Sequence, residues 1–599
     1  MTKMRLADFV INWLVEKGIT DTFFVSGGGI MHLVDAIGKN HKMRYFSTHH
    51  EQACAVAAEA WARINNKPGV CLVTTGPGAT NALTGVAGAY MDSIPMIVIS
   101  GQVRSDILAD YSRQRQIGPQ EGNTIPTVEH NTKYAKLILD PKEILYELEK
   151  SYYIAMNGRP GPVWLDIPLN IQATIIDTTT LRKFAIPKRK INKQFVKQVA
   201  TVVTLLKQAK RPILILGGGV RSSGITTAFL DSFINRIGAP VVAPYSGLDL
   251  VAEKHPLSMG RFGPVGQRRA NFALQNSDLM ISIGTGLSIA AIGFNFAGFA
   301  PKAKKIMVNI DPGELSKPTI KVDMGIEADA GDFIQELLKQ LGKTKLGYDP
   351  RWAKACNYWK KTYKTIIPEF YEKKNFVNPY IFFDKLSEII TSKDTVVTGN
   401  SLDAVCMLQS LKVQKNQRAF TNSNWGAMGW CLPGSIGAAV ASKAQTILVT
   451  GDGSIQFNIH ELGTISHYKL PIKIFIINND GYESIRTTQE THFAGNYVGS
   501  NVGSGVTNPN FRYLAKAYGI PYLTMKNNSE IIKITKKSLN VKGPVIIEMK
   551  VDPEQHRNPR VSSFKRADGT MESRPLEDMW PFLPREEIEA NMSMFEDDK

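Results

Sequence analysis

The sequence predicts an α/β protein of three consecutive domains, each with a parallel sheet flanked by helices. Two observations support this fold class. Short apolar runs with the length of buried parallel strands alternate with helical segments along the 599 residues. A segment near the start also recurs near the end: Leu72 and Pro95 are 23 positions apart, as are Leu448 and Pro471, and each interval holds a glycine turn and a helix. The first and third domains are therefore expected to be related copies.

The composition is that of a globular protein, with 43% hydrophobic and 21% charged residues. The net charge of +17 is spread over lysine-rich segments, which favours an anionic substrate and argues against a nucleic-acid partner. The five cysteines have no paired spacing, so neither disulfides nor a zinc site is expected. Nothing at the N-terminus resembles a signal peptide, and no apolar run has the length of a membrane span. We therefore expect a cytoplasmic protein with no membrane partner.

The first domain is expected over residues 1–172. Its opening elements are a helix over 4–17, strands over 22–25 and 45–48, and a helix over 52–63. Gly28 lies in a glycine turn after the first of these strands, where the backbone can lie against a ligand. Glu51 follows the second strand, at the sheet edge where open α/β sheets bind ligands. A glutamate there is also an ordinary helix cap, so Glu51 alone does not define a site.

The central domain is expected over residues 192–343, after a polar linker. Its predicted elements are a helix from about Gln194 and strands over 213–216, 279–283 and 305–310. The first strand runs into Gly217, Gly218 and Gly219, a turn typical of Rossmann-like nucleotide sites. Three glycines after a strand are weak support for a ligand on their own.

The third domain is expected over residues 375–552, after a linker over 348–374 that is rich in Trp, Tyr and Lys. A strand over 446–450 ends at a turn containing Asp452, before a helix near Gln456, and a strand over 472–477 ends beside Asn479. Carboxyl ends of parallel strands meet at one sheet edge, so Asp452, Asn479 and the Gly481 carbonyl form a set of hard oxygen donors. Such a set suits Mg²⁺ that also holds phosphate oxygens, although an ordinary strand-turn-helix remains the alternative.

Four motifs resemble the acetolactate synthase branch of thiamine-diphosphate enzymes, in the order of that family and over residues 4 to about 552. They are His50-Glu51-Gln52-Ala53, Gly76-Pro77-Gly78-Ala79-Thr80-Asn81, Trp425-Gly426-Ala427-Met428-Gly429, and the Gly451-Asp452-Gly453 turn followed by Asn478-Asn479. The resemblance implies a pyrimidine-binding first domain and a diphosphate-binding third domain. It also implies a homodimer or tetramer with active sites at the subunit interface.

The resemblance implies a role for each motif. Glu51 is expected to hydrogen-bond the aminopyrimidine ring of the cofactor and so promote loss of the thiazolium proton. Met428 is expected to hold the cofactor in a bent shape above the backbone of Gly426. Mg²⁺ is assigned to Asp452, Asn479 and the carbonyl of Gly481. The further thiamine-diphosphate contacts that we assign are Gly28, Pro77, Asn81, Gly453, Ser454 and Tyr482.

The fate of the two-carbon unit depends on the residues around the substrate. Related decarboxylases place a histidine pair after the glutamate, but residues 107–120 contain no histidine. Gln120-Glu121 instead resembles the carboligase segment, and Gln120 is a candidate hydrogen-bond donor to the substrate. The sequence therefore favours a carboligase that decarboxylates a 2-oxo acid, pyruvate in the first place, and transfers the two-carbon unit to a carbonyl acceptor.

Three positions depart from the acetolactate synthase pattern. Ala290 replaces the arginine that binds the carboxylate of the acceptor pyruvate, and Thr488 replaces a tryptophan. Gly286 replaces another arginine, so binding of FAD through Gly217, Gly218, Gly219 and Asp311 becomes an open expectation.

These departures favour an acceptor other than pyruvate, with a nucleotide-linked keto-sugar first. The polar tail over 553–599 carries Arg560, Lys565, Arg566 and Arg574 and is a candidate lid that meets such an anionic acceptor. The alternatives are an acetolactate synthase with an unusual pocket and a regulatory paralogue without catalytic activity. The intact Glu51, Asp452 and Asn479 argue against the last.

Overall fold

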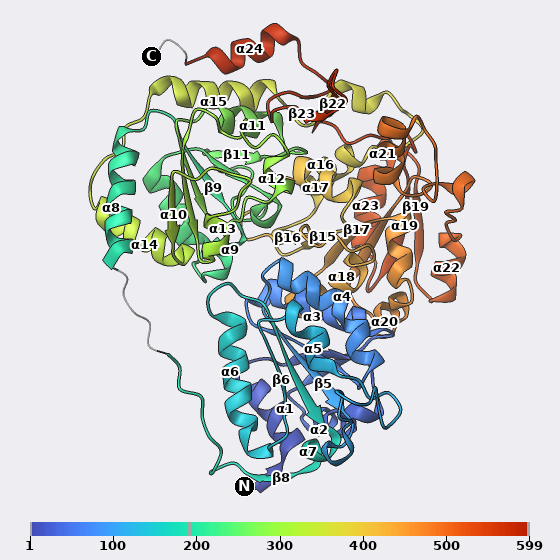
Figure 1. Cartoon of the computed structure of the whole chain (residues 1–599). Coiled ribbons are helices and arrows are strands. Elements are labelled where there is room, and N and C mark those ends of the chain that lie inside the picture. The colour runs from blue at the N-terminus through green and yellow to red at the C-terminus, as the bar shows by residue number, and fades with distance from the viewer. Residues whose placement is uncertain (1–2, 188–192, 596–599) are drawn as a thin grey trace.

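The computed structural model describes residues 3–187 and 193–595 and contains three six-stranded parallel sheets, one in each domain (Figure 1). The predicted fold class is confirmed. In the described part of the chain, no helix combines the length and the apolarity needed to cross a bilayer.

The first and third domains have sheets with the same order of strands, which supports the predicted duplication. The first sheet runs β3-β2-β4-β5-β7-β6 and the third runs β16-β15-β17-β18-β20-β19. The strands of the first are β2 (Asp21–Phe24), β3 (Arg44–Ser47), β4 (Gly69–Val73), β5 (Met96–Gln102), β6 (Tyr134–Leu137) and β7 (Pro162–Pro168). Those of the third are β15 (Thr395–Thr398), β16 (Ala419–Phe420), β17 (Thr446–Gly451), β18 (Ile472–Asn478), β19 (Tyr522–Met525) and β20 (Val545–Lys550).

Helices cover both sheets. In the first domain they are α1 (Leu6–Glu16), α2 (Met31–Lys39), α3 (Glu51–Asn65), α4 (Pro77–Met91), α5 (Thr124–Val128), α6 (Ile144–Met156) and α7 (Leu169–Ala173). In the third they are α16 (Pro379–Ile389), α17 (Leu402–Ser410), α18 (Cys431–Ser442), α19 (Asp452–Ile455), α20 (Glu461–His467), α21 (Glu483–Phe493), α22 (Phe511–Ala517) and α23 (Ile531–Leu539). The first domain continues to β8 (Ile175–Asp177), which pairs with β1 (Lys3–Arg5).

The central sheet has the strand order β11-β10-β9-β12-β13-β14, which is the Rossmann order. Its strands are β9 (Pro212–Leu216), β10 (Val241–Ala243), β11 (Ser258–Arg261), β12 (Leu279–Ile283), β13 (Lys304–Asn309) and β14 (Met324–Glu327). Its helices are α8 (Lys193–Gln208), α9 (Gly218–Ser222), α10 (Thr227–Ile237), α11 (Arg268–Gln275), α12 (Ile289–Ile292), α13 (Pro312–Leu315) and α14 (Ala330–Leu341). The Gly217–Gly219 turn follows β9 beside β12, where the strand order reverses and such sheets bind ligands.

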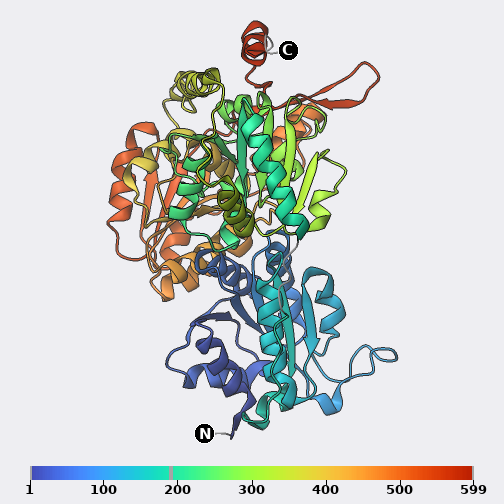
Figure 2. The ribbon, with the colours of Figure 1, turned by 90° about the vertical axis from the view of Figure 1, so that its left-hand side faces the viewer.

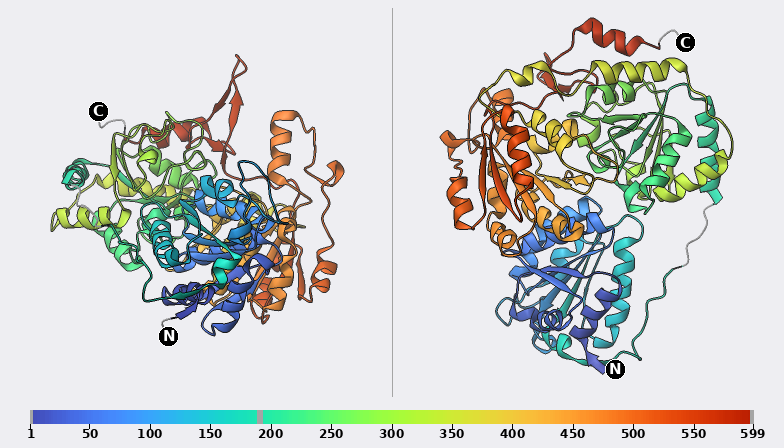
Figure 3. Two further views of the ribbon diagram at one scale, coloured as in Figure 1. Left: turned by 60° about the horizontal axis from the view of Figure 1, so that its bottom comes forward. Right: turned by 180° about the vertical axis from the view of Figure 1, so that it is seen from behind.

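The first and third domains lie against each other (Figure 3) and meet through α3 and α18 (Figure 1). The helices approach closely because Gly437 has no side chain; a Cβ there would lie 2.0 Å from the Ala57 carbonyl oxygen. Glu59 is buried between them. It accepts a hydrogen bond from Trp430 Nε1 (2.6 Å) and forms an ion pair with Arg63 (2.5 Å). Arg63 compensates the buried charge of Glu59, and the hydrogen bond from Trp430 joins this carboxylate of the first domain to the third domain.

Arg418 lies where all three domains meet. Its guanidinium pairs with Asp249 of the central domain at 2.8 Å and donates to the carbonyl of Arg63 in the first domain. Arg418 itself directly precedes β16 of the third domain.

The residues before and after the third domain pack on the central domain. The expected linker over 348–374 contains α15 (Pro350–Thr362), an amphipathic helix whose Trp352 and Trp359 are buried. The tail adds α24 (Arg585–Ser593), which lies over α11 and α15 (Figure 1), and Trp359 Nε1 donates to Asn591 Oδ1 at 2.8 Å.

Before α24, the tail forms two small antiparallel pairs. β21 (Arg560–Val561) pairs with β24 (Met579–Trp580), and β22 (Ser563–Lys565) with β23 (Met571–Ser573). The second pair projects from the body of the molecule (Figure 2). Three arginines of the tail have partners within it: Arg560 lies over the Trp580 ring, Arg566 pairs with Glu572, and Arg574 pairs with Asp578.

Candidate active site

Asp452 is the centre of the polar cluster at the edge of the third sheet. It is the first residue of α19, directly after β17, and only 1% of it is exposed. Its Oδ2 accepts hydrogen bonds from the amides of Asn479 and Gly481 (both 3.1 Å) and from Asn508 Nδ2 (2.7 Å). Oδ1 accepts only the amide of Gly453, at 2.7 Å, in the described chain. Burial raises the pKa of Asp452 to about 6, although these hydrogen bonds oppose the rise.

The loop after β18 brings Asn479 and Gly481 to the same point. β17 and β18 are neighbours in the sheet, so their carboxyl ends lie side by side. Gly481 has φ 123°, and a Cβ there would lie 2.5 Å from the Ser500 carbonyl oxygen, so glycine is required. The Arg486 guanidinium donates to the carbonyls of Asn479 and Asp480 (both 2.9 Å) and fixes the loop.

These residues fit a hard divalent cation. The described residues contain no cluster of three or more His, Cys, Asp or Glu side chains placed to hold a metal ion. The set at Asp452 instead combines a carboxylate, a carboxamide and a backbone carbonyl, which are the oxygen ligands of Mg²⁺. Because Oδ1 of Asp452 accepts one hydrogen bond, it retains a lone pair for a cation.

Three further predicted residues surround this cluster. The ring of Tyr482 covers Gly453, where a Cβ would lie 2.2 Å from the ring. Ser454 Oγ accepts a hydrogen bond from the amide of Gly429 at 3.0 Å and so joins the turn to the segment that carries Gly426 and Met428. Gly426 has φ 69° with open space at its Cβ position, and Met428 is half-buried.

A second polar cluster lies at the edge of the first sheet. Glu51 begins α3, and its Oε2 accepts a hydrogen bond from Asn81 Nδ2 at 3.0 Å. Pro77 begins α4, the helix that carries Asn81. Gly28 lies in the turn after β2, and the amide of the next residue, Gly29, donates to Thr74 Oγ1 at 3.2 Å. The structure therefore gathers Glu51, Pro77, Asn81 and the Gly28 turn at one edge.

Gln120 lies next to this cluster. Its φ of 64° is in the left-handed region, which is uncommon for a residue with a side chain. Its carbonyl oxygen packs on Gly76, where a Cβ would lie 2.1 Å away. The side chain of Gln120 is exposed, as a substrate contact requires.

The described chain does not join the two clusters by a hydrogen bond. Glu51 is bonded to Asn81, and Asp452 to the loops around Asn479 and Asn508. Within the chain, the two domains meet instead through α3 and α18.

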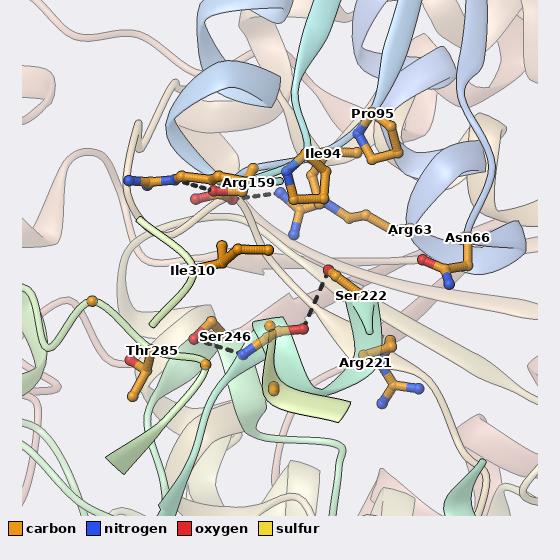
Figure 4. A pocket seen from close by; sticks show the side chains of 18 of the residues that line it. Arg63, Asn66, Ile94, Pro95, Arg159, Arg221, Ser222, Ser246, Thr285 and Ile310 are labelled. Carbon is orange, nitrogen blue, oxygen red and sulfur yellow. Dashed lines mark hydrogen bonds and ion pairs between the residues drawn. The ribbon is translucent and has the colours of Figure 1, made fainter. Parts of the chain in front are cut away.

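A cavity of about 720 Å³ lies where the three domains meet (Figure 4). This volume is in the range of small-molecule sites. Gly218 and Gly219 line it from the central domain, and Gly219 has no room for a side chain because a Cβ would lie 2.8 Å from Gly284. Gly217 and Asp311 do not line the cavity. Asp311 caps α13 and pairs with Arg159 of the first domain at 2.9 Å.

The three departures from the family pattern lie at different places. Ala290, in α12, and Thr488, in α21, are both exposed. Gly286 lines the central cavity, and the Glu314 carboxylate lies 2.7 Å from the position of a Cβ on Gly286. Glu314 is held there by Arg159 at 3.0 Å.

Two residues support the site without a role predicted from the sequence: Asn508, and Glu121, which the sequence places only in the carboligase-like Gln120-Glu121 segment. Asn508 contacts Asp452 across 56 positions, and Glu121 is buried in the loop of Gln120. The Asn508-Pro509-Asn510 run is a turn signal in the sequence, but it does not show which strand end the turn contacts.

Comparisons with known proteins agree with the geometry. Residues 4–122 match the family model of the thiamine pyrophosphate enzyme N-terminal TPP binding domain, residues 199–337 the central domain, and residues 402–549 the C-terminal TPP binding domain. The acetolactate synthase large subunit of Cyanidium caldarium is 32% identical over 93% of this chain and 94% of its own length. The probable acetolactate synthase large subunit of Methanococcus aeolicus is 32% identical over 92% of each chain. The isozyme 1 large subunit of Escherichia coli is 28% identical over 93% and 95%.

Proposed function

The chain belongs to the acetolactate synthase family of thiamine-diphosphate-dependent enzymes, and from this premise we propose that it decarboxylates pyruvate and ligates the two-carbon unit to a second carbonyl compound. The observation that carries the proposal is the pair of polar clusters at corresponding sheet edges. Glu51 with Asn81 forms one, and Asp452 with the Asn479 loop forms the other. A silent regulatory paralogue is disfavoured because both clusters are complete.

The third-domain cluster would hold the charged end of the cofactor. Asp452 Oδ1, the Asn479 side chain and the Gly481 carbonyl would bind Mg²⁺, with Gly453 and Ser454 beside the diphosphate. Thiamine diphosphate, when bound, supplies the nucleophilic carbon that adds to the 2-oxo acid and accepts the electrons released with CO₂.

The first-domain cluster would hold and move the proton. Glu51 carries the proton at a carboxylate oxygen, and the hydrogen bond from Asn81 to Oε2 orients that carboxylate. Met428 would support the cofactor from below, and Gln120 would donate a hydrogen bond to the substrate. A carboligase must also exclude protons from the carbon that will attack the acceptor, which agrees with the absence of histidine from residues 107–120.

We propose that two copies of the chain complete each active site. Within one chain no described hydrogen bond joins Glu51 and Asp452, and the first and third domains contact each other through α3 and α18. A dimer in which the first domain of one copy faces the third domain of the other would bring both clusters to one cofactor. In a dimer with two-fold symmetry each such contact occurs twice, which gives two equivalent sites.

For the acceptor, a second pyruvate is the first candidate, because the relatives are named acetolactate synthases. The nucleotide-linked keto-sugar that the sequence placed first becomes the second candidate. It is still favoured by Ala290 and Thr488, which remove an arginine and a tryptophan of the family pattern. The tail gives it less support than expected, since Arg566 and Arg574 are engaged by carboxylates of the tail itself.

We propose that the central cavity binds FAD. Support comes from the Rossmann strand order, from Gly218 and Gly219 at the cavity wall, and from its volume of about 720 Å³. Gly217 would act by close packing, because a Cβ there would lie 2.3 Å from Thr285. Flavin absorbance of the purified protein tests this assignment directly.

The experiment for the activity supplies labelled pyruvate with thiamine diphosphate and Mg²⁺. CO₂ release with acetolactate as the main product would support the first candidate. CO₂ release that requires an added nucleotide-linked 4-keto-deoxysugar would support the second. Absence of CO₂ release from the cofactor-loaded protein under both conditions would contradict the proposal.

A further inference from the structure

Glu121 is a buried carboxylate that the proposed reaction does not use. Only 6% of it is exposed. Its Oε1 accepts hydrogen bonds from the amide of Ala109 (2.6 Å) and the hydroxyl of Tyr111 (3.3 Å). Its Oε2 accepts the amides of Ile117 (2.6 Å) and Gly118 (3.1 Å). Burial alone would raise the pKa of Glu121, but these donors outweigh it and lower the pKa, so the group is an ionised acceptor.

These four bonds organise a segment that has no helix or strand of its own. Residues 108–123 lie between a short turn after β5 and the start of α5. The donors to Glu121 precede it by 3 to 12 positions, so one carboxylate closes the whole loop onto itself. The other side-chain hydrogen bonds within this segment are a local turn at Asp110 and the bond from Tyr111 to Gly122, so Glu121 is the group that ties residues 109, 117 and 118 together.

The loop is fixed to the sheet at the residues on both sides of Glu121. Gln120 packs its carbonyl against Gly76, the residue before the helix that carries Asn81. The Gly122 carbonyl accepts hydrogen bonds from Gln102 Nε2 (2.9 Å) and the Tyr111 hydroxyl (3.1 Å). Gln102 in turn donates to the buried Asp166 at 3.1 Å.

The backbone of Gln120 is in the left-handed region. A residue with a side chain adopts φ 64° only where its surroundings require it. The contacts of its neighbours impose this conformation. Glu121 binds the amides of the loop that precedes Gln120, and Gln102 binds the carbonyl of Gly122, two residues after it. The backbone of Gln120 is thereby held against Gly76, at the start of the helix that carries Asn81.

We propose that Glu121 is the positioning residue of Gln120: it closes the loop 109–122 and so sets the Gln120 side chain against the active-site edge of the first sheet. The structural part of this inference is independent of the reaction. Its kinetic part rests on the proposed carboligation, and the two parts are tested by separate measurements.

The structural test is amide hydrogen exchange of the full chain with Glu121→Gln. A glutamine presents an NH₂ group to donors that now bind an oxygen, so the amides of residues 109, 117 and 118 should exchange at least roughly tenfold faster. Glu129→Gln is the matched control, because Glu129 is exposed and lies eight positions further along the chain. Unchanged exchange at all three amides in Glu121→Gln would overturn the inference.

Glu121→Asp is the second variant, in case the glutamine variant does not fold. It keeps the charge and the number of acceptor sites but shortens the side chain by one carbon, so it should loosen the same amides to a smaller extent. Unchanged exchange at these amides in the folded aspartate variant would also overturn the inference.

The kinetic test compares how the holoenzyme divides the two-carbon units between released aldehyde and the ligated product. Glu121→Gln and Gln120→Ala should both increase the share of two-carbon units released as aldehyde, and the double variant should show no further increase. The affinity for thiamine diphosphate should stay within about twofold, which separates positioning from general destabilisation. An altered partition in Gln120→Ala with a normal partition in Glu121→Gln would overturn the inference. A normal partition in Gln120→Ala would instead overturn the proposed use of Gln120, while the exchange result would still decide the role of Glu121 in the loop.

Discussion

Replacing Asn508 by alanine should weaken Mg²⁺ binding without removing any ligand of the ion. Asn508 Nδ2 donates to Oδ2 of Asp452 at 2.7 Å, and Gln456 Nε2 donates to Asn508 Oδ1 at 3.0 Å. The bond therefore both stabilises the negative charge of Asp452 and connects it to the helix turn behind it. In the alanine variant, Oδ2 keeps only the two backbone donors from the Asn479 loop.

The magnitude follows from the type of bond that is lost. A hydrogen bond to a charged group contributes about 1.5–3 kcal/mol, and residues that orient a metal ligand typically change metal affinity by roughly 10- to 100-fold. Because Asp452 is buried, water replaces the lost donor poorly. We expect the dissociation constant of Mg²⁺ to rise by roughly 10-fold or more.

The assay is a titration of Mg²⁺ at saturating thiamine diphosphate, followed by the intrinsic fluorescence of the protein. Asn510→Ala is the matched control, since Asn510 lies two positions away and caps α22 through the amides of Arg512 (3.1 Å) and Tyr513 (3.2 Å). Loss of this cap should lower the free energy of unfolding by about 1 kcal/mol and leave the Mg²⁺ affinity unchanged. Mg²⁺ binding by Asn508→Ala within twofold of the parent, or an equal loss of Mg²⁺ affinity in Asn510→Ala, would refute this role of Asn508.

Three further outcomes are expected. Glu51→Gln should abolish turnover and change the affinity for thiamine diphosphate only a few-fold, because it removes the proton carrier and keeps its shape; rapid exchange of the cofactor C2 proton in this variant would contradict the role of Glu51. The affinity for Mg²⁺ should rise as the pH rises through about 6, because burial raises the pKa of Asp452 and only the ionised form binds the ion. The stability that this raised pKa gives the apoprotein should be lost as the pH rises through the same value. Titrations between pH 5 and 8 measure both. Ala290→Arg should lower the KM for a second pyruvate by roughly tenfold, and an unchanged KM would remove position 290 from the acceptor site.

The strands, and the residues that directly follow them, could be predicted from the sequence. The predicted strand over 279–283 coincides with β12, and the predicted strand over 446–450 differs from β17 by one residue. Asp452 and Asn479 could be placed together because they follow neighbouring parallel strands, and that geometry fixes their proximity.

Other features depend on contacts that leave no periodic pattern. The helix expected near Gln456 begins instead at Asp452 as the short α19, in whose first turn the Asp452 carboxylate accepts the amide of Gly453. The segment 348–374 was expected to be a linker because its lysines mask the buried stripe of α15 that contains Trp352 and Trp359. The hydrogen bond of Asn508 joins two segments that are distant in the sequence, and those of Glu121 close an irregular loop, so only the structure reveals them.

The position of Arg418 has a thermodynamic consequence for the central cavity. The cavity is walled by all three domains, and Arg418 joins them through Asp249 and the Arg63 carbonyl. Any molecule that fills this space binds only when the three domains are assembled, so its binding energy adds to the energy that holds them together. At a free concentration 100 times its dissociation constant, such a ligand contributes about 2.7 kcal/mol. Filling the cavity should therefore raise the temperature at which the assembled domains unfold.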